Sequence, residues 1–389
     1  MTANNEKVPV FAPASASPFR RSRRGPGEAN SQRGKVIGDE SDGITLFVAD
    51  CSTVPPTYLR RAITIPALFL GTLVLTVLSP VLLGLAAVVD LITGPRRFRN
   101  LRTGIFLIWL AWIETIAVFV AAIVWLRHLG RMHGAETQRR LQRIVALYGH
   151  RILGATSRSL GLRIEATGAE CLSDGAPVLI FGHHTSLLDS VIPVEIAGYG
   201  HDYSLHYVIK KSLAWGPAFD VVGHWARIHF VDRTGKDSER EMDSIAALGL
   251  NLQKRQAPVI YPEGTFYNKK RLARAVERLR EQAPELVSRA ERLRHVLPPR
   301  TGGATALLDA APDADVVFVV HAGFERFTTI GRIFRSIPFR HPVPVNVWRV
   351  PRRDVPTEPQ ERYRWLFDNF ERMDRWVIEQ LEPLQTKAA

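Results

Sequence analysis

The stretch that decides the fold is Ala176-Pro-Val-Leu-Ile-Phe-Gly-His-His-Thr-Ser-Leu-Leu-Asp189. Its first half, through Gly182, is apolar and predicts a buried strand. After Asp189 the chain continues in a helical pattern through Ile196. The polar half of the stretch is therefore expected at a strand-to-helix junction.

His184 and Asp189 are the candidate catalytic residues of this junction. Within a regular helix their side chains would point about 140° apart, so they can meet only if His184 lies in the turn before the helix. The carboxylate would then fix the tautomer of the imidazole and leave the other ring nitrogen as a general base. The alternative is that Thr185 or Ser186 caps the helix and the histidines only pack.

Further along the chain, short β-branched or aromatic runs alternate with helix-like stretches such as residues 238–256 and 272–297. Together with Val178–Phe181, the runs are Tyr207–Ile209, Ile228–Val231, Val259–Tyr261, Val316–Val320 and Val343–Val347. This alternation predicts an α/β fold, with a mixed, partly parallel sheet flanked by helices.

Two long apolar blocks precede this region. Residues 63–89 run without a charge, and residues 104–126 contain a single acidic residue, Glu114. Each block is about as long as a helix that crosses a ~30 Å hydrocarbon core. They predict a membrane-associated helical hairpin, in which Pro66 and Pro80 could break the first helix. The alternative is a pair of buried core helices in a soluble protein.

Arginines flank both apolar blocks and also lie between them. If both blocks span the bilayer, the heavier outer flanks favour cytoplasmic termini, but the basic connection opposes this arrangement. Two helices that lie in one leaflet would let every arginine face the same anionic surface. We expect a membrane protein whose α/β domain is on the cytoplasmic face.

Charge and cysteine content narrow the function classes. The 389 residues carry a formal charge of +13, from 51 Lys and Arg against 38 Asp and Glu, which indicates an anionic partner. The two cysteines, Cys51 and Cys171, exclude a disulfide framework and a cysteine-based zinc site. No recognised nucleic-acid-binding module is present, so we predict membrane lipid and not nucleic acid as the partner.

Composition also divides the chain into three parts. Residues 1–55 predict a disordered basic tail, because they have few large apolar side chains. Residues 56–130 are the predicted membrane anchor of one or two apolar helices. Residues 131–389 are the predicted catalytic domain with a C-terminal extension.

Three further segments accompany the histidine stretch. They are Phe230-Val231-Asp232-Arg233, Pro262-Glu263-Gly264-Thr265 and the late strand Val316–Val320. In order and separation, these segments and the histidine stretch resemble the four blocks of the glycerolipid acyltransferase superfamily, that of 1-acylglycerol-3-phosphate acyltransferase. The resemblance covers roughly residues 140 to 350.

Other segments point to one branch of that family. Gly235-Lys236-Asp237, the stretch from His295 through Gly303, and Arg349-Val350-Pro351 resemble the lysocardiolipin and lysophosphatidylinositol acyltransferase branch. That resemblance implies a membrane-bound enzyme of phospholipid biosynthesis.

The resemblance implies roles for the matching residues. His184 would deprotonate the free hydroxyl of a lysophospholipid, which attacks an acyl thioester, and Asp189 would orient His184. The donor would be acyl-CoA or acyl carrier protein, with no acyl-enzyme, metal or other cofactor. Arg233 would hold the phosphate of the acceptor, unless it only forms a structural ion pair.

The third block would contribute further substrate contacts. Glu263, Gly264 and Thr265 would help to fix the acceptor, although a buried glutamate can also serve only to satisfy backbone amides. The family usually has arginine after the threonine, where this chain has Phe266. We expect Lys269, or one of the two basic residues after it, to replace that cation.

Three other positions depart from the family pattern. His183 stands where asparagine is usual, Arg227 where glycine is usual, and His321 where proline is usual. These differences put the identity of the acceptor in doubt more than the reaction. The alternatives are an acyltransferase for a different lipid or glycolipid acceptor, or a catalytically weak scaffold of a lipid complex.

A basic amphipathic stretch, Leu272–Leu297, follows the third block. It contains six arginines, and it could lie on anionic lipid. Because glutamates are spaced to pair with the arginines along a helix, an ordinary solvated helix is the equal alternative. Pro284 is expected to divide the stretch into two pieces.

Overall fold

The computed structural model describes residues 55–94, 97–128, 134–226, 228–231, 238–327 and 329–386. Nearly all of the predicted basic tail, residues 1–54, lies outside these ranges, and so does Arg233. The division of the chain at residues 55 and 130 stays a prediction.

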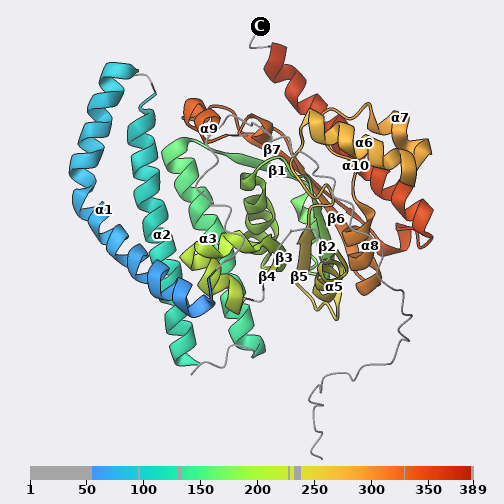
Figure 1. The fold of residues 1–389 in the computed structure, drawn as a ribbon, viewed down its shortest axis with the longest axis horizontal. Coiled ribbons are helices and arrows are strands. Elements are labelled where there is room, and N and C mark those ends of the chain that lie inside the picture. The colour runs from blue at the N-terminus through green and yellow to red at the C-terminus, as the bar shows by residue number, and fades with distance from the viewer. Residues whose placement is uncertain are drawn as a thin grey trace, which may run out of the picture. The chain divides into compact units, whose positions relative to one another are not determined.

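The described residues form an α/β domain around one seven-stranded sheet (Figure 1). The strands are β1 (Ile164–Thr167), β2 (Val178–Gly182), β3 (Ser204–Lys210), β4 (His229–Val231), β5 (Gln256–Ile260), β6 (Asp315–His321) and β7 (Val343–Val350). Their order is β1-β7-β6-β2-β5-β3-β4, and all neighbours are parallel except β6 and β7. The predicted mixed, partly parallel sheet is thus confirmed.

Helices cover both faces of the sheet (Figure 1). The helices of the domain are α3 (Ala135–Leu160), α4 (Val191–Pro193), α5 (Ser238–Gly249), α6 (Lys269–Gln282), α7 (Val287–Ala290), α8 (Thr301–Ala310), α9 (Ile330–Ser336) and α10 (Pro359–Thr386). The predicted helix 272–297 is divided into α6, a 3₁₀ turn that begins at Pro284, and α7.

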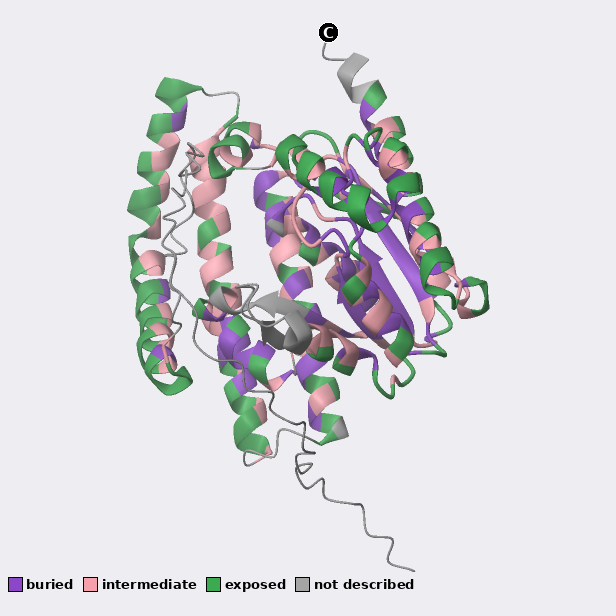
Figure 2. Ribbon diagram, turned by 45° about the vertical axis from the view of Figure 1, so that its right-hand side comes forward, coloured by how far each residue is buried: buried purple, intermediate pink, exposed green. Residues whose placement is uncertain are grey.

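The central strands are buried on both sides, as Figure 2 shows in purple. Because side chains alternate along a strand, Ile180 packs in one core while Leu179 and Phe181 pack in the other. The first core includes the end of α3, and the second includes α5, α8 and α10. Burial on both faces explains why β2 and β6 are continuous apolar runs.

The two apolar blocks form the long helices α1 (Thr57–Thr93) and α2 (Arg99–Arg127). Both are long and apolar enough to cross a membrane. Pro66 and Pro80 lie inside α1 and do not end it, so the possible break in this helix is not present. Most of α1 is exposed, whereas α2 lies between α1 and α3 (Figure 2). The predicted helical hairpin is therefore present, and its length and exposed apolar surface suit membrane association.

Both ends of this hairpin are bonded to the α/β domain. Near the start of α1, the buried Arg60 contacts both oxygens of Asp220, at 2.5 and 3.1 Å. At the other end, Arg99 donates to the carbonyl oxygen of Ile337 at 3.3 Å, and Arg102 donates to that of Ser159 at 3.1 Å. The hairpin thus lies along the domain and does not project away from it.

Candidate active site

The histidines lie in a tight turn at the C-terminal end of β2. His183 and His184 directly follow the strand, and the 3₁₀ turn Leu187–Ser190 comes next. Ser186 caps this turn with its Oγ, while the carboxylate of Asp189 accepts the backbone N–H of Ser186 at 2.9 Å. The structure thus contains the Ser186 cap of the alternative interpretation, and it also places His184 in the turn before the helical segment, which is the position that a contact with Asp189 needs.

The side chains of His184 and Asp189 meet across the turn. His184 Nδ1 lies 3.4 Å from Asp189 Oδ2, which is longer than a normal hydrogen bond. The imidazole also packs against the rings of Tyr261 and Phe266, with centroids 4.5 and 4.4 Å away. The side chain of His184 is 16% exposed and that of Asp189 is 1% exposed. His184 is therefore the member of the pair that a substrate can reach.

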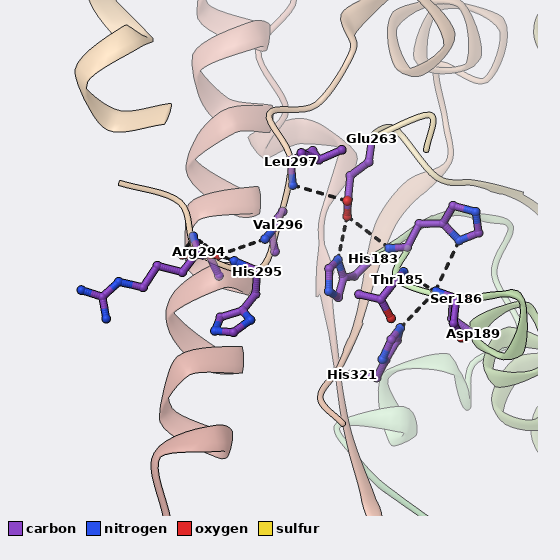
Figure 3. A network of polar contacts seen from close by, with 12 residues as sticks. His183, Thr185, Ser186, Asp189, Glu263, Arg294, His295, Val296, Leu297 and His321 are labelled. Carbon is purple, nitrogen blue, oxygen red and sulfur yellow. Dashed lines mark hydrogen bonds and ion pairs between the residues drawn. The ribbon is translucent and has the colours of Figure 1, made fainter. Parts of the chain in front are cut away.

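His321 approaches the same carboxylate from the neighbouring strand (Figure 3). It ends β6, and its Nε2 lies 3.4 Å from Asp189 Oδ2. β2 and β6 run in parallel with Gly182 opposite Val319, so both strands end at the same edge of the sheet. In the sequence, His321 stands out only as a departure from the fourth block. The available signal for this contact was that histidines stand at or directly after the ends of two predicted strands.

These two histidines determine the charge of Asp189. Burial acts to raise the pKa of the carboxyl, but His184 and His321 outweigh it and hold the pKa of Asp189 well below its usual value. The backbone N–H of Thr185 also donates to Oδ2 at 2.5 Å. Asp189 is therefore ionised and can stabilise a positive charge on His184.

Glu263 belongs to the same polar cluster (Figure 3). Its Oε1 lies 2.6 Å from His183 Nδ1 and accepts the backbone N–H of His184 at 3.1 Å. Its Oε2 accepts the backbone N–H of Leu297 at 3.4 Å. This geometry matches the alternative considered for Glu263, in which a buried glutamate satisfies backbone amides. Its role as an acceptor-binding residue stays a prediction.

Burial controls the protonation of His183 and Glu263, whose side chains are both 0% exposed. It lowers the pKa of His183 to about 3 and raises the pKa of Glu263 to about 8, because a low-dielectric interior favours neutral groups. This second pair is thus held without a buried net charge at neutral pH. Within the described ranges, no group of three or more His, Cys, Asp or Glu residues is arranged to hold a metal ion.

The turn after β5 opens on a cleft of about 800 Å³. Glu263, Gly264 and Thr265 all contribute to its lining. Gly264 has φ +69°, and a Cβ at this position would lie 3.0 Å from the side chain of Arg300. The left-handed backbone favours glycine here, whereas the flexible side chain of Arg300 could shift to admit a Cβ.

The cations of this region differ from those expected. Lys269 is exposed at the start of α6 and is not part of the lining of the cleft. Arg233 lies outside the described residues, so the roles of both residues stay predictions. The arginines that line the cleft are Arg271, Arg274, Arg278 and Arg300. The sequence signal for the three arginines of α6 was their spacing. Arg271, Arg274 and Arg278 recur about one helical turn apart, so they lie on one face of the helix.

Comparisons with known proteins support the predicted resemblance. The family described as Acyltransferase matches residues 163–322. A curated relative, "1-acyl-sn-glycerol-3-phosphate acyltransferase epsilon" of Mus musculus, is 26% identical over 265 residues, which cover 62% of this chain and 68% of the relative. A solved structure, the 1-acyl-sn-glycerophosphate acyltransferase PlsC from Thermotoga maritima, covers 73% of this chain and 98% of its own, with a TM-score of 0.49 and 14% identity.

The matched region contains the whole polar cluster. It begins at the first residues of the sheet and ends just after His321, so it includes His183, His184, Asp189 and Glu263. The predicted resemblance is confirmed, while the branch within the family stays a prediction. Residues 163–322 form an acyltransferase domain, and the chain is similar to 1-acylglycerol-3-phosphate acyltransferases.

Proposed function

We propose that the protein transfers a fatty acyl group from an acyl thioester to the free hydroxyl of a lysophospholipid. The observation that carries this proposal is a contrast in exposure. His184 is 16% exposed beside the ionised Asp189, whereas the side chains of His183 and His321 are at most 1% exposed. A general base must reach the proton that it removes, and of these three histidines His184 has the accessible side chain.

His184 and Asp189 have different roles in the proposed reaction. Nδ1 of His184 faces Asp189, which leaves Nε2 to accept the hydroxyl proton as the hydroxyl oxygen attacks the thioester carbonyl carbon. The C–S bond breaks as the ester bond forms, and the departing thiolate takes the proton from His184. The acyl group never bonds to the protein, and the reaction needs no cofactor.

Glu263 and His183 support this base from the other side. Glu263 accepts the backbone N–H of His184 while it is bonded to His183, so it holds the turn in the position that aims His184. We assign Glu263 as a positioning residue in this proposal. Gly264 and Thr265 line the cleft next to it and would contact substrate.

The acceptor is proposed to be a lysophospholipid with a substituted head group. Phe266 stands where the family usually has arginine, and its ring lies 4.4 Å from the ring of His184. An apolar ring replaces a phosphate-binding cation directly beside the base. This arrangement favours an acceptor whose phosphate is held elsewhere over lysophosphatidate.

The reaction is tested with purified full-length protein in detergent, labelled acyl-CoA or acyl carrier protein, and a panel of lysophospholipids. We expect label in a diacyl product with wild type and a loss of about 10²- to 10⁴-fold in His184→Ala. His341→Ala removes an exposed histidine and is the matched control. Equal background for wild type and His184→Ala with every acceptor would contradict catalysis and support a lipid-complex scaffold.

The hairpin is proposed to lie in one leaflet on the cytoplasmic side. Arginines at both of its ends are bonded to the α/β domain, so the hairpin and the domain would contact the same face of the membrane. Variants lacking Cys51 and Cys171, with one cysteine at Tyr58 or Gly94, can be labelled with an impermeant maleimide in sealed vesicles. Both positions should react from the same side. Labelling of Gly94→Cys only from the opposite side would show two membrane spans.

A further inference from the structure

The cleft lies next to the turn that carries the proposed base. Its lining includes two neighbours of His184: Tyr261, whose ring packs on the imidazole, and Glu263, which accepts the backbone N–H of His184. Residues of α5, α6 and the start of α8 form its walls. A ligand between these three helices would therefore have one end beside the residues that contact His184.

Four guanidinium groups line the cleft. Arg271, Arg274 and Arg278 are spaced by three and four residues on α6, which places them on one face of the helix. Arg300 lines the cleft from the residue before α8. The one acidic residue of the lining is Glu263, which is already bonded to His183 and to two backbone amides.

The cleft-facing arginines of α6 differ from their neighbour in what they contact. Arg280 of the same helix pairs with Glu277 at 3.5 Å and with Glu291 at 3.3 Å. In the described part of the chain, the three cleft-facing arginines of α6 form no ion pair with a carboxylate. Like charges gathered in this way repel one another, so a bound polyanion would stabilise the cleft.

Buried carboxylates hold the opposite wall in place. Asp374 is 3% exposed and accepts the backbone N–H groups of residues 294–296 at 2.7 to 3.0 Å. Glu263 accepts the next N–H, that of Leu297. The segment that leads to Arg300 is thus organised before any ligand binds, which lowers the entropic cost of binding.

The start of α8 adds to the positive potential of the cleft. Thr301, Gly302 and Gly303 belong to its lining, and no side chain caps this helix in the described structure. The first N–H groups of a helix lack partners within the helix and carry partial positive charge. They complement the four guanidinium groups, which are planar donors suited to phosphate.

We propose that this cleft binds the phosphate groups of a coenzyme A thioester, the donor in the acyl transfer proposed above. Coenzyme A carries a pyrophosphate and a ribose phosphate, which match four arginines better than a single phosphodiester does. A volume of about 800 Å³ also lies within the range of pockets for small molecules. An acyl carrier protein would instead require a broad basic surface.

The position of the cleft favours a water-soluble ligand over a lipid head group. In both Figure 1 and Figure 2, α6 lies across the sheet from α1 and α2, the helices that would contact the membrane. The acyl chains of a lysophospholipid belong near that apolar surface. The phosphate end of a soluble donor can enter from the opposite side and direct its thioester toward His184.

The test combines direct binding with donor kinetics in the full-length protein. Adenosine 3′,5′-bisphosphate, which has the adenosine and two of the three phosphates of coenzyme A and no pantetheine, should bind to wild type and to His184→Ala in calorimetry. The double variant Arg274→Gln/Arg278→Gln should weaken this binding and raise the KM for acyl-CoA by about 10- to 100-fold, because each arginine supplies a charge-assisted contact. Both side chains are exposed, so misfolding is not expected. Arg280→Gln is the matched control.

Substrate comparison separates the possible ligands. The KM for the lysophospholipid should not change in the double variant, and an acyl-N-acetylcysteamine thioester, which has no phosphate, should show no dependence on the two arginines. If only the KM for the lysophospholipid rose, the cleft would be assigned to the head group of the acceptor. If activity were lost only with acyl carrier protein as donor, the cleft would be assigned to that protein. Either result would overturn the proposal. Binding of the bisphosphate without any acyl transfer would retain the cleft assignment and refute the proposed reaction.

Discussion

Replacing Asp189 with asparagine isolates the contribution of its charge. The amide keeps an oxygen that can accept the backbone N–H groups of Thr185 and Ser186, which now donate to Oδ2 at 2.5 and 2.9 Å. The fold of the turn should therefore survive. What disappears is the negative charge 3.4 Å from His184 Nδ1.

The size of the effect follows from that distance. An imidazolium and a carboxylate 3.4 Å apart attract each other by about 5 kcal/mol at an effective dielectric constant of about 20. At about 1.4 kcal/mol per tenfold change in rate, this sets a ceiling of about 4,000-fold. A general base contributes about 10²- to 10⁴-fold, so we expect kcat to fall by between about 100-fold and about 4,000-fold in Asp189→Asn.

The assay measures kcat and KM for both substrates, with circular dichroism to show that the variant is folded. KM should change little, because Asp189 is buried and acts through His184. Asp354→Asn, which changes an exposed aspartate, is the control for loss of one negative charge. A folded Asp189→Asn variant with the kcat of wild type would refute the role assigned to this carboxylate.

Three other substitutions test the polar cluster and the turn beside it. The pKa of Glu263 is raised from 4.5 to about 8, so its contribution to the free energy of unfolding is complete below about pH 4.5 and is lost as the pH rises to about 8. Glu263→Gln should flatten the decline between these two pH values, as measured by thermal unfolding at several pH values. His321→Leu removes one of the groups that lower the pKa of Asp189, so the pKa of this carboxyl should rise in an NMR titration of the variant, and an unchanged pKa would contradict this. Gly264→Ala should lower the free energy of unfolding by about 1 to 2 kcal/mol in chemical denaturation, because φ is +69° there, and no loss would show that the turn relaxes.

Much of the fold could be predicted because its signals are local. The uninterrupted apolar run of β2, the alternation of short strands with helices, and the two charge-poor blocks each reflect burial or solvent contact within one segment. Strand order and the reversed direction of β7 could not be predicted, because they depend on contacts between segments far apart in the chain.

The candidate site, like the fold, could be predicted only where its contacts are local in the sequence. The pair His184 and Asp189 is separated by five positions, so turn geometry alone indicated that the two residues can meet. The contact between His183 and Glu263 joins residues 80 positions apart, and it exists because β2 and β5 are parallel neighbours that end at one edge. Nothing in the sequence around either residue indicates this pairing.

By itself, the sequence determined which segments are buried strands, which two helices are long and apolar, and which turn carries the two adjacent histidines, because hydrophobic period and residue type act over a few positions. Only the tertiary structure decided that Asp189 is shared by His184 and His321, that Glu263 bonds to the histidine turn, and that Arg300 lines the same cleft as the arginines of α6. The physical reason is that charge and hydrogen bonding act over a few ångströms in space. Strand register and helical phase determine which side chains reach that range.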